Sequence, residues 1–240
     1  MAGCLDVIES HASVREYTGE PVEESHLNAI IEAARRAPTA WNLQPITVIA
    51  VTERGLLERL ARDVGGQEHV ARASVFLVFA LDARKVWLAA RSSGVEPARP
   101  GLGHLATWML DAGIAAGWAA LAAEELGYGV AFIAVYGNPC SVAETLHLPQ
   151  GVLPVVGLAI GRPAERPGPR PRQPPEAFWG RNRYPNLPPR AMAEAVAGVY
   201  GGRAARLYRH VLAAGGYYER VSSVLERCLQ RLDPGGDAGP

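Results

Sequence analysis

The stretch VFLVFALD, residues 75–82, decides the fold class of this chain. Seven of its eight residues are apolar, which is typical of a short strand buried inside a protein. Similar segments are ITVIAV (46–51), VAFIAVY (130–136) and VLPVVGLAIG (152–161). Helical patterns separate these strands, so the sequence predicts an α+β fold with few strands and many helices.

The helices are expected from apolar spacing and from the residues that end them. Leu27, Ile30, Ile31 and Ala34 share one helix face, and Pro38 should stop that helix. Further helices are expected at 56–64, 104–126, 141–148, 190–213 and 217–231.

The segment 105–123 is nearly long enough to cross a membrane and has a single charge, Asp111. Most of it is alanine and glycine, which contribute little insertion energy, whereas a central aspartate costs about 2.5–3.5 kcal/mol. We therefore expect a buried helix of a globular core or of a subunit interface.

Composition divides the chain into three parts. A core is expected at 1–165, and a proline-rich surface excursion followed by a helical extension at 166–232. The last residues, 233–240, are expected to form a flexible tail.

The charges and cysteines narrow the class of protein. The formal net charge is zero, so nothing attracts the chain globally to nucleic acid or to an anionic membrane, and a small-molecule ligand is favoured. Cys4, Cys140 and Cys228 are far apart and odd in number, which argues against a disulfide framework or a cysteine-rich metal site. No secretion signal is recognisable at the N-terminus, so we expect a cytoplasmic protein.

Common catalytic and nucleotide motifs are absent from the sequence. Gly101, Gly103 and Ala106 form a G-x-G-x-x-A pattern, but no apolar strand precedes it as a dinucleotide loop requires. The six histidines show no metal-binding pair, and no hydrolase motif is present, so metal and hydrolase chemistry are disfavoured.

Polar clusters in predicted loops remain as candidate binding residues. Each alone has a structural alternative, such as a helix cap or a solvated surface charge. Together they suit a phosphorylated heterocycle with an amide edge, because arginines can fork onto a phosphate and a glutamine can pair with an imide. Flavin mononucleotide (FMN) has these features. The clusters are His11, Ser13 and Arg15; Thr39, Asn42 and Gln44; Gln67 and His69; and Arg170 and Arg172.

The order of these motifs resembles the nitroreductase family of flavoenzymes. SHASVREYTGEPV (10–22) is similar to the family's opening motif, and AARRAPTAWNLQP (33–45) is similar to its second loop. GGQEHV (65–70) and the C-terminal extension resemble the NADPH-linked branch, which contains the oxygen-insensitive major nitroreductase and the NADPH flavin reductase of luminous bacteria. The resemblance covers about residues 4–232.

The resemblance implies a nitroreductase-like fold. Its central, mostly antiparallel sheet is surrounded by helices, and a C-terminal helical extension completes an intertwined homodimer that binds one FMN in each of two interface pockets. Arg15, Arg170 and Arg172 fall at phosphate positions, and His11 and Ser13 fall near the ribityl phosphate. The implied contacts to the rest of the flavin are Thr39 from the partner chain, Asn42 in the same loop, Gln67 at the pyrimidine edge, and the backbone of Phe132, Ile133, Ala134 and Val135 near N5.

The chain departs from the family pattern in two places. Ala12 replaces a usual arginine, which leaves one fewer cation for the phosphate, and Ala134 and Val135 stand where glycine is frequent, which narrows the space above the ring. A looser match implies a site for the 2′-phosphate of NADPH, with ordinary surface arginines as the alternative. That site would consist of Arg203, Arg206 and Arg209.

The expected activity is transfer of hydride from NADPH or NADH, through bound FMN, to nitroaromatics, quinones or free flavin. The flavin carries this chemistry, so no side chain need act as a nucleophile. Three alternatives stay open: an FMN carrier or sensor without turnover, a relative that performs dehydrogenation or flavin destruction, and a structural dimer that binds no flavin.

Overall fold

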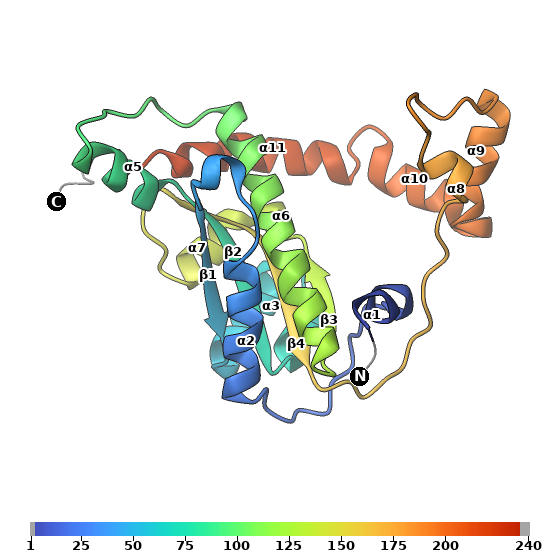
Figure 1. Cartoon of the computed structure of the whole chain (residues 1–240), viewed down its shortest axis with the longest axis horizontal. Helices are drawn as coiled ribbons and strands as arrows, with labels where there is room; N and C mark the ends of the chain where they lie inside the picture. The colour runs from blue at the N-terminus through green and yellow to red at the C-terminus, as the bar shows by residue number, and fades with distance from the viewer. Residues whose placement is uncertain (1–2, 236–240) are drawn as a thin grey trace. The chain divides into compact units, whose positions relative to one another are not determined.

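A four-stranded antiparallel sheet forms the centre of the protein (Figure 1). The structure is a computed structural model that describes residues 3–235. The strands lie in the order β1-β2-β4-β3, which confirms the predicted α+β class with a mostly antiparallel sheet. They are β1 (Ile46–Val51), β2 (Val75–Asp82), β3 (Gly129–Ile133) and β4 (Val152–Gly161). β3 ends three residues earlier than predicted, because a 3-10 turn begins at Val135.

Strand β2 is central, and all eight of its residues are buried. Its alternating side chains contribute to two separate core clusters. Leu77 and Phe79 pack with the helices α2 (Glu24–Arg35) and α6 (Leu102–Glu125). Phe76 and Val78 pack with α3 (Arg54–Asp63), α4 (Glu68–Arg72) and α7 (Pro139–Thr145). The helices therefore cover both faces of the sheet.

Helix α6 is long and apolar enough to span a membrane by length and composition alone. Eight of its residues, mostly alanines, are buried, and alanines from Ala115 to Ala123 belong to the cluster between α6, α2 and the sheet. These contacts are those of a core helix, as the sequence predicts. Leu110 and Trp118 on the same helix remain exposed.

The other helices show where sequence patterns were insufficient. The continuous helix predicted at 190–213 is wrong: it is divided by a 3-10 turn at Gly201–Arg203, where Gly201 has a φ of +53°. The remaining helices are α1 (Cys4–Ser10), α5 (Ala83–Ser92), α8 (Pro175–Phe178), α9 (Pro189–Gly198), α10 (Ala204–Leu212) and α11 (Tyr217–Leu229). Four helices were not predicted from the sequence: α1, α4, α5 and the four-residue α8.

The chain forms two compact units. Of the described residues, unit 1 contains the sheet and comprises 3–168 and 224–235; unit 2 comprises residues 169–223. Residues 224–232 were expected in the C-terminal extension, but they belong to unit 1. Of the tail expected at 233–240, residues 236–240 lie outside the described part of the chain.

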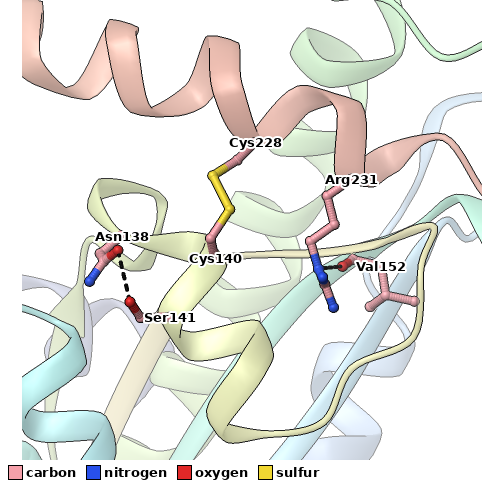
Figure 2. The surroundings of a disulfide bond; sticks show 6 residues. All are labelled: Asn138, Cys140, Ser141, Val152, Cys228 and Arg231. Atoms are coloured by element: carbon pink, nitrogen blue, oxygen red, sulfur yellow. Dashed lines mark hydrogen bonds between the residues drawn. A yellow bond between two sulfur atoms is a disulfide. The ribbon is translucent and has the colours of Figure 1, made fainter.

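A disulfide in unit 1 joins Cys140 of α7 to Cys228 of α11 (Figure 2). The expectation against a disulfide is wrong for this pair. The two residues are 88 positions apart in sequence, yet their Cα atoms are 6.3 Å apart. Spacing along the chain could not reveal this proximity, because packing of the chain's end against α7 creates it. Beside the bond, Arg231 Nε donates to the carbonyl of Val152 at 3.2 Å.

Candidate functional site

The opening polar motif starts at the free edge of strand β3 and then crosses the end of the sheet, past the residues that follow β4. The Val14 amide donates to the Val130 carbonyl at 2.9 Å, and the Thr18 amide donates to the Arg162 carbonyl at 3.0 Å. A Cβ on Gly129 would lie 2.6 Å from the Val14 side chain, so this close approach requires glycine. The backbone bonds thus hold the segment that carries His11, Ser13 and Arg15 against the sheet.

Helix α4 brings the third predicted cluster close to this opening segment. Arg72 Nη1 of α4 lies 3.1 Å from Glu16 Oε2. Burial, and then the nearby charge of Arg15, lower the pKa of His69. Gln67 is exposed and lies immediately before α4. The structure therefore gathers parts of the first and third clusters at one end of the sheet.

The guanidinium of Arg15 is available to a ligand. Its backbone amide donates to Glu165 Oε1 at 2.6 Å, whereas its guanidinium contacts only the Ser13 carbonyl, at 3.5 Å. Among the described residues it has no carboxylate partner, and it is exposed. The Nε2 atom of His69 is also buried, and it has no hydrogen-bond partner among the residues that the structure describes. A free cation beside an unpartnered polar atom fits an anionic, polar ligand such as FMN.

His11 forms a partly buried pair with Glu124 near the end of α6. Its Nδ1 lies 2.7 Å from Glu124 Oε1. Burial raises the pKa of Glu124, and His11 opposes that shift. Both residues line a cavity of about 380 Å³ together with Ala12 and Arg166. Ala12, where the family pattern has arginine, therefore borders this cavity.

The end of β3 and the residues just after it alternate between buried and exposed. Ile133 and Val135 are buried in the core, whereas Phe132 and Ala134 are exposed. This alternation is that of an edge strand with one covered face. Only Phe132 and Ala134 can therefore present side chains to a ligand at this edge.

Thr39 and Asn42 lie elsewhere in unit 1. Their loop leads into β1, which is the edge strand opposite β3. Three strand spacings separate β1 from β3, or about 14 Å. Within a single chain, this loop and the opening motif therefore lie apart.

Three of the predicted arginines share a cavity within unit 2. Arg170, Arg172 and Arg203 line a space of about 930 Å³. None of the three has an ion pair among the residues that the structure describes. Arg206 and Arg209 are exposed on α10 and are not among its lining residues. The aromatic residues lining the cavity are Phe178, Trp179 and Tyr200.

Sequence reasoning missed three acidic residues that organise these segments. Glu124 binds His11, Glu165 accepts the amides of Arg15 and Glu16, and Asp111 accepts the amide of Ala40 at 3.1 Å. Only Asp111 carried a visible signal, as the single charge in an apolar helix. The other two acids resemble ordinary surface residues until the fold places them. Across residues 3–235, no three His, Cys, Asp or Glu side chains group as a metal site would require.

Comparisons with known proteins agree with this geometry. The Nitroreductase family matches residues 8–162. An FMN reductase [NAD(P)H] from Bacillus subtilis is 40% identical over 187 residues, which are 75% of this chain and 75% of that protein. An oxygen-insensitive NADPH nitroreductase from Salmonella typhimurium is 37% identical over 196 residues, or 80% of this chain and 79% of that protein.

A solved structure extends the likeness beyond the family match. The hypothetical oxidoreductase YcnD from Bacillus subtilis superimposes with a TM-score of 0.82 and 31% identity, covering 95% of this chain and 97% of that one. The sequence match, the antiparallel sheet and the opening motif on its edge lead to one conclusion. The chain belongs to the nitroreductase family.

Proposed function

We propose that this protein is an FMN-dependent oxidoreductase that transfers hydride from NADPH or NADH to nitroaromatics, quinones or free flavin. The observation that carries the proposal is the unpaired, exposed Arg15 beside His69 on the sheet edge, within a chain 40% identical to an FMN reductase. Bound flavin would supply the redox chemistry itself. The chain's own residues would hold, orient and shield it.

The roles of the residues follow from their chemistry and exposure. Arg15, Arg170 and Arg172 provide charge-assisted hydrogen bonds to the phosphate, and His11 and Ser13 add donors near it. The exposed amide of Gln67 can both donate to and accept from the pyrimidine edge. Asn42 contacts the flavin from the loop that also carries Thr39. Around N5 the contacts come from the backbone of Phe132, Ile133, Ala134 and Val135.

A homodimer is part of this proposal. The sheet order supports it, because Thr39 and Arg15 lie at opposite edges of one sheet. A second copy could bring its Thr39 to the flavin that the first copy holds. Exposed apolar residues on α6, including Leu110 and Trp118, offer a surface for such an association.

Recognition of NADPH is proposed for the arginines of unit 2. Arg203 lines the aromatic cavity, and Arg206 and Arg209 follow it at helical spacing on α10. An arginine there could bind the 2′-phosphate, a group that NADH lacks.

We also propose a cytoplasmic location. Glutathione and thioredoxin in that compartment would tend to reduce the Cys140–Cys228 disulfide.

The first experiment is a spectrum of the purified protein. We expect a yellow protein that bleaches anaerobically with NADPH and recovers its colour when a quinone is added. Protein that stays colourless when FMN is supplied would contradict the proposal. Bound flavin that NADPH and NADH both leave oxidised would instead support a carrier or sensor.

The second experiment replaces Arg15 and Arg172 together with alanine. Two charge-assisted bonds contribute roughly 3–6 kcal/mol, so FMN affinity should fall by about two to four orders of magnitude. The matched control is Arg59→Ala, which removes an exposed arginine of α3. Retention of stoichiometric flavin by a folded double variant would refute the assigned roles.

A further inference from the structure

The loop from Thr39 to Gln44 has an unusual backbone. Trp41, Asn42 and Gln44 have φ values of +56°, +53° and +53°, and none of them is glycine. Each non-glycine residue in this left-handed region costs about 1–2 kcal/mol. Such a conformation persists only where the surrounding structure imposes it, and it is frequent at functional sites.

Internal hydrogen bonds close this loop on itself. The Gln44 amide donates to Thr39 Oγ1 at 3.1 Å, and the Asn42 amide donates to the Thr39 carbonyl at 3.0 Å. These bonds define the turn, but they do not attach it to the core. Trp41 is 98% exposed, so its side chain gives the loop no apolar anchor within this chain.

A buried carboxylate supplies that attachment. Asp111 of α6 is 3% exposed, and its Oδ1 accepts the Ala40 amide at 3.1 Å. Ala40 is the first residue of the 3-10 turn that contains Trp41 and Asn42. This bond ties the start of the left-handed turn to the longest helix of unit 1.

Asp82 offers a contrast within the same unit. It is also buried, but both of its oxygens are used: Oδ1 accepts the Lys85 amide at 3.0 Å, and Oδ2 accepts the Thr47 hydroxyl at 2.6 Å. The Oδ2 atom of Asp111 is buried and has no partner among the described residues. Burying a half-satisfied carboxylate is costly. Asp82 therefore has a complete structural explanation, whereas the one side-chain hydrogen bond of Asp111 to a described residue goes to the strained loop.

We propose that Asp111 is a positioning residue: by binding the Ala40 amide it holds the Thr39–Gln44 loop in the conformation that presents Thr39 and Asn42 to the flavin. The inference rests on the proposed function, since those two residues act only if FMN binds. Asp111 itself does not contact the cofactor. Its effect passes through the backbone of the loop.

The test compares Asp111→Leu, which has no acceptor, with Asp111→Asn, which keeps one oxygen for the Ala40 amide. Loss of a hydrogen bond to a charged acceptor should weaken FMN binding roughly tenfold to a hundredfold in the leucine variant and less in the asparagine variant. Flavin fluorescence quenching measures the affinity. Amide hydrogen exchange of the loop is the second readout, and exchange should accelerate in the same order.

Two further variants separate positioning from general stability. Asp82→Asn should lower the melting temperature but leave FMN affinity within about twofold, because Asp82 lies outside the loop. Gln44→Gly in the Asp111→Leu background should restore part of the affinity, because glycine adopts positive φ without strain. A purely structural Asp111 would give no such rescue, and absence of rescue would overturn the proposal.

The wild-type protein provides a test that does not depend on any variant folding. The Ala40 amide should exchange at least about tenfold more slowly than the Trp41 amide, which has no hydrogen-bond partner among the described residues, and rapid exchange of Ala40 would overturn the inference. Failure of the proposed function is distinguishable, since the wild type would then bind no FMN at all. An Asp111→Leu protein with unchanged FMN affinity and unchanged loop exchange would refute the positioning role alone.

Discussion

Units 1 and 2 differ in how many of their hydrophobic side chains are buried. In unit 1, every residue of β2 is buried and the sheet is packed on both faces. Among the described residues of unit 2, Val221 is the one buried hydrophobic residue, at 8% exposed, and the arginines are exposed. The comparison teaches that substitutions in the sheet should change stability, whereas substitutions in unit 2 should change binding.

Substitution of one phenylalanine in each unit should give the largest difference in stability between the units. Phe79 of β2 is fully buried, so Phe79→Ala should lower the free energy of unfolding by about 3–5 kcal/mol. Phe178 of unit 2 is 80% exposed, so Phe178→Ala should change it by less than about 0.5 kcal/mol. Urea denaturation measures both, and equal losses would break the comparison.

Removal of the disulfide should have the next largest effect. Cys140 and Cys228 close a long loop that includes all of unit 2, although both cysteines belong to unit 1. Replacing both with serine should destabilise unit 1 by about 2–4 kcal/mol. Cys4→Ser is the matched control, because Cys4 is an exposed free thiol. If a reductant left the melting temperature of the wild type unchanged, the bond would have no stabilising role.

Arg203→Ala should act on binding rather than on stability. Loss of one phosphate contact should raise the KM for NADPH about tenfold and leave that for NADH nearly unchanged. Arg209→Ala tests whether α10 contributes equally, since Arg209 does not line the unit 2 cavity. Steady-state kinetics with both nucleotides give the answer. Equal effects on NADPH and NADH would exclude 2′-phosphate recognition by Arg203.

The smallest expected effect is a loss of stability of unit 1 at acidic pH. Burial, and then the charge of Arg15, lower the pKa of His69, so the folded state prefers neutral imidazole. Its contribution to stability is therefore present above the ordinary histidine pKa and is lost as the pH falls through the lowered value. His69→Gln should flatten the decline of melting temperature between about pH 7 and pH 5. An unaltered pH profile in this variant would exclude His69 as its source.

Much of the sheet and part of the site could be predicted from local patterns. The ranges 46–51, 75–82 and 152–161 were expected as strands and are β1, β2 and β4, because each is short, apolar and bounded by breakers. The opening motif and the second loop indicated the family directly. Helix α5 was missed, although its apolar residues are spaced for one face.

The amino-acid sequence by itself determined the fold class, the family and the residue types available to bind an anionic cofactor, since these depend on local spacing and chemistry. Tertiary structure decided the pairings His11–Glu124, Ala40–Asp111 and Cys140–Cys228, whose partners are 71–113 residues apart. It also decided that the Thr39 loop and Arg15 lie at opposite sheet edges. The physical reason is that such proximity arises from packing and strand order, which no local pattern encodes.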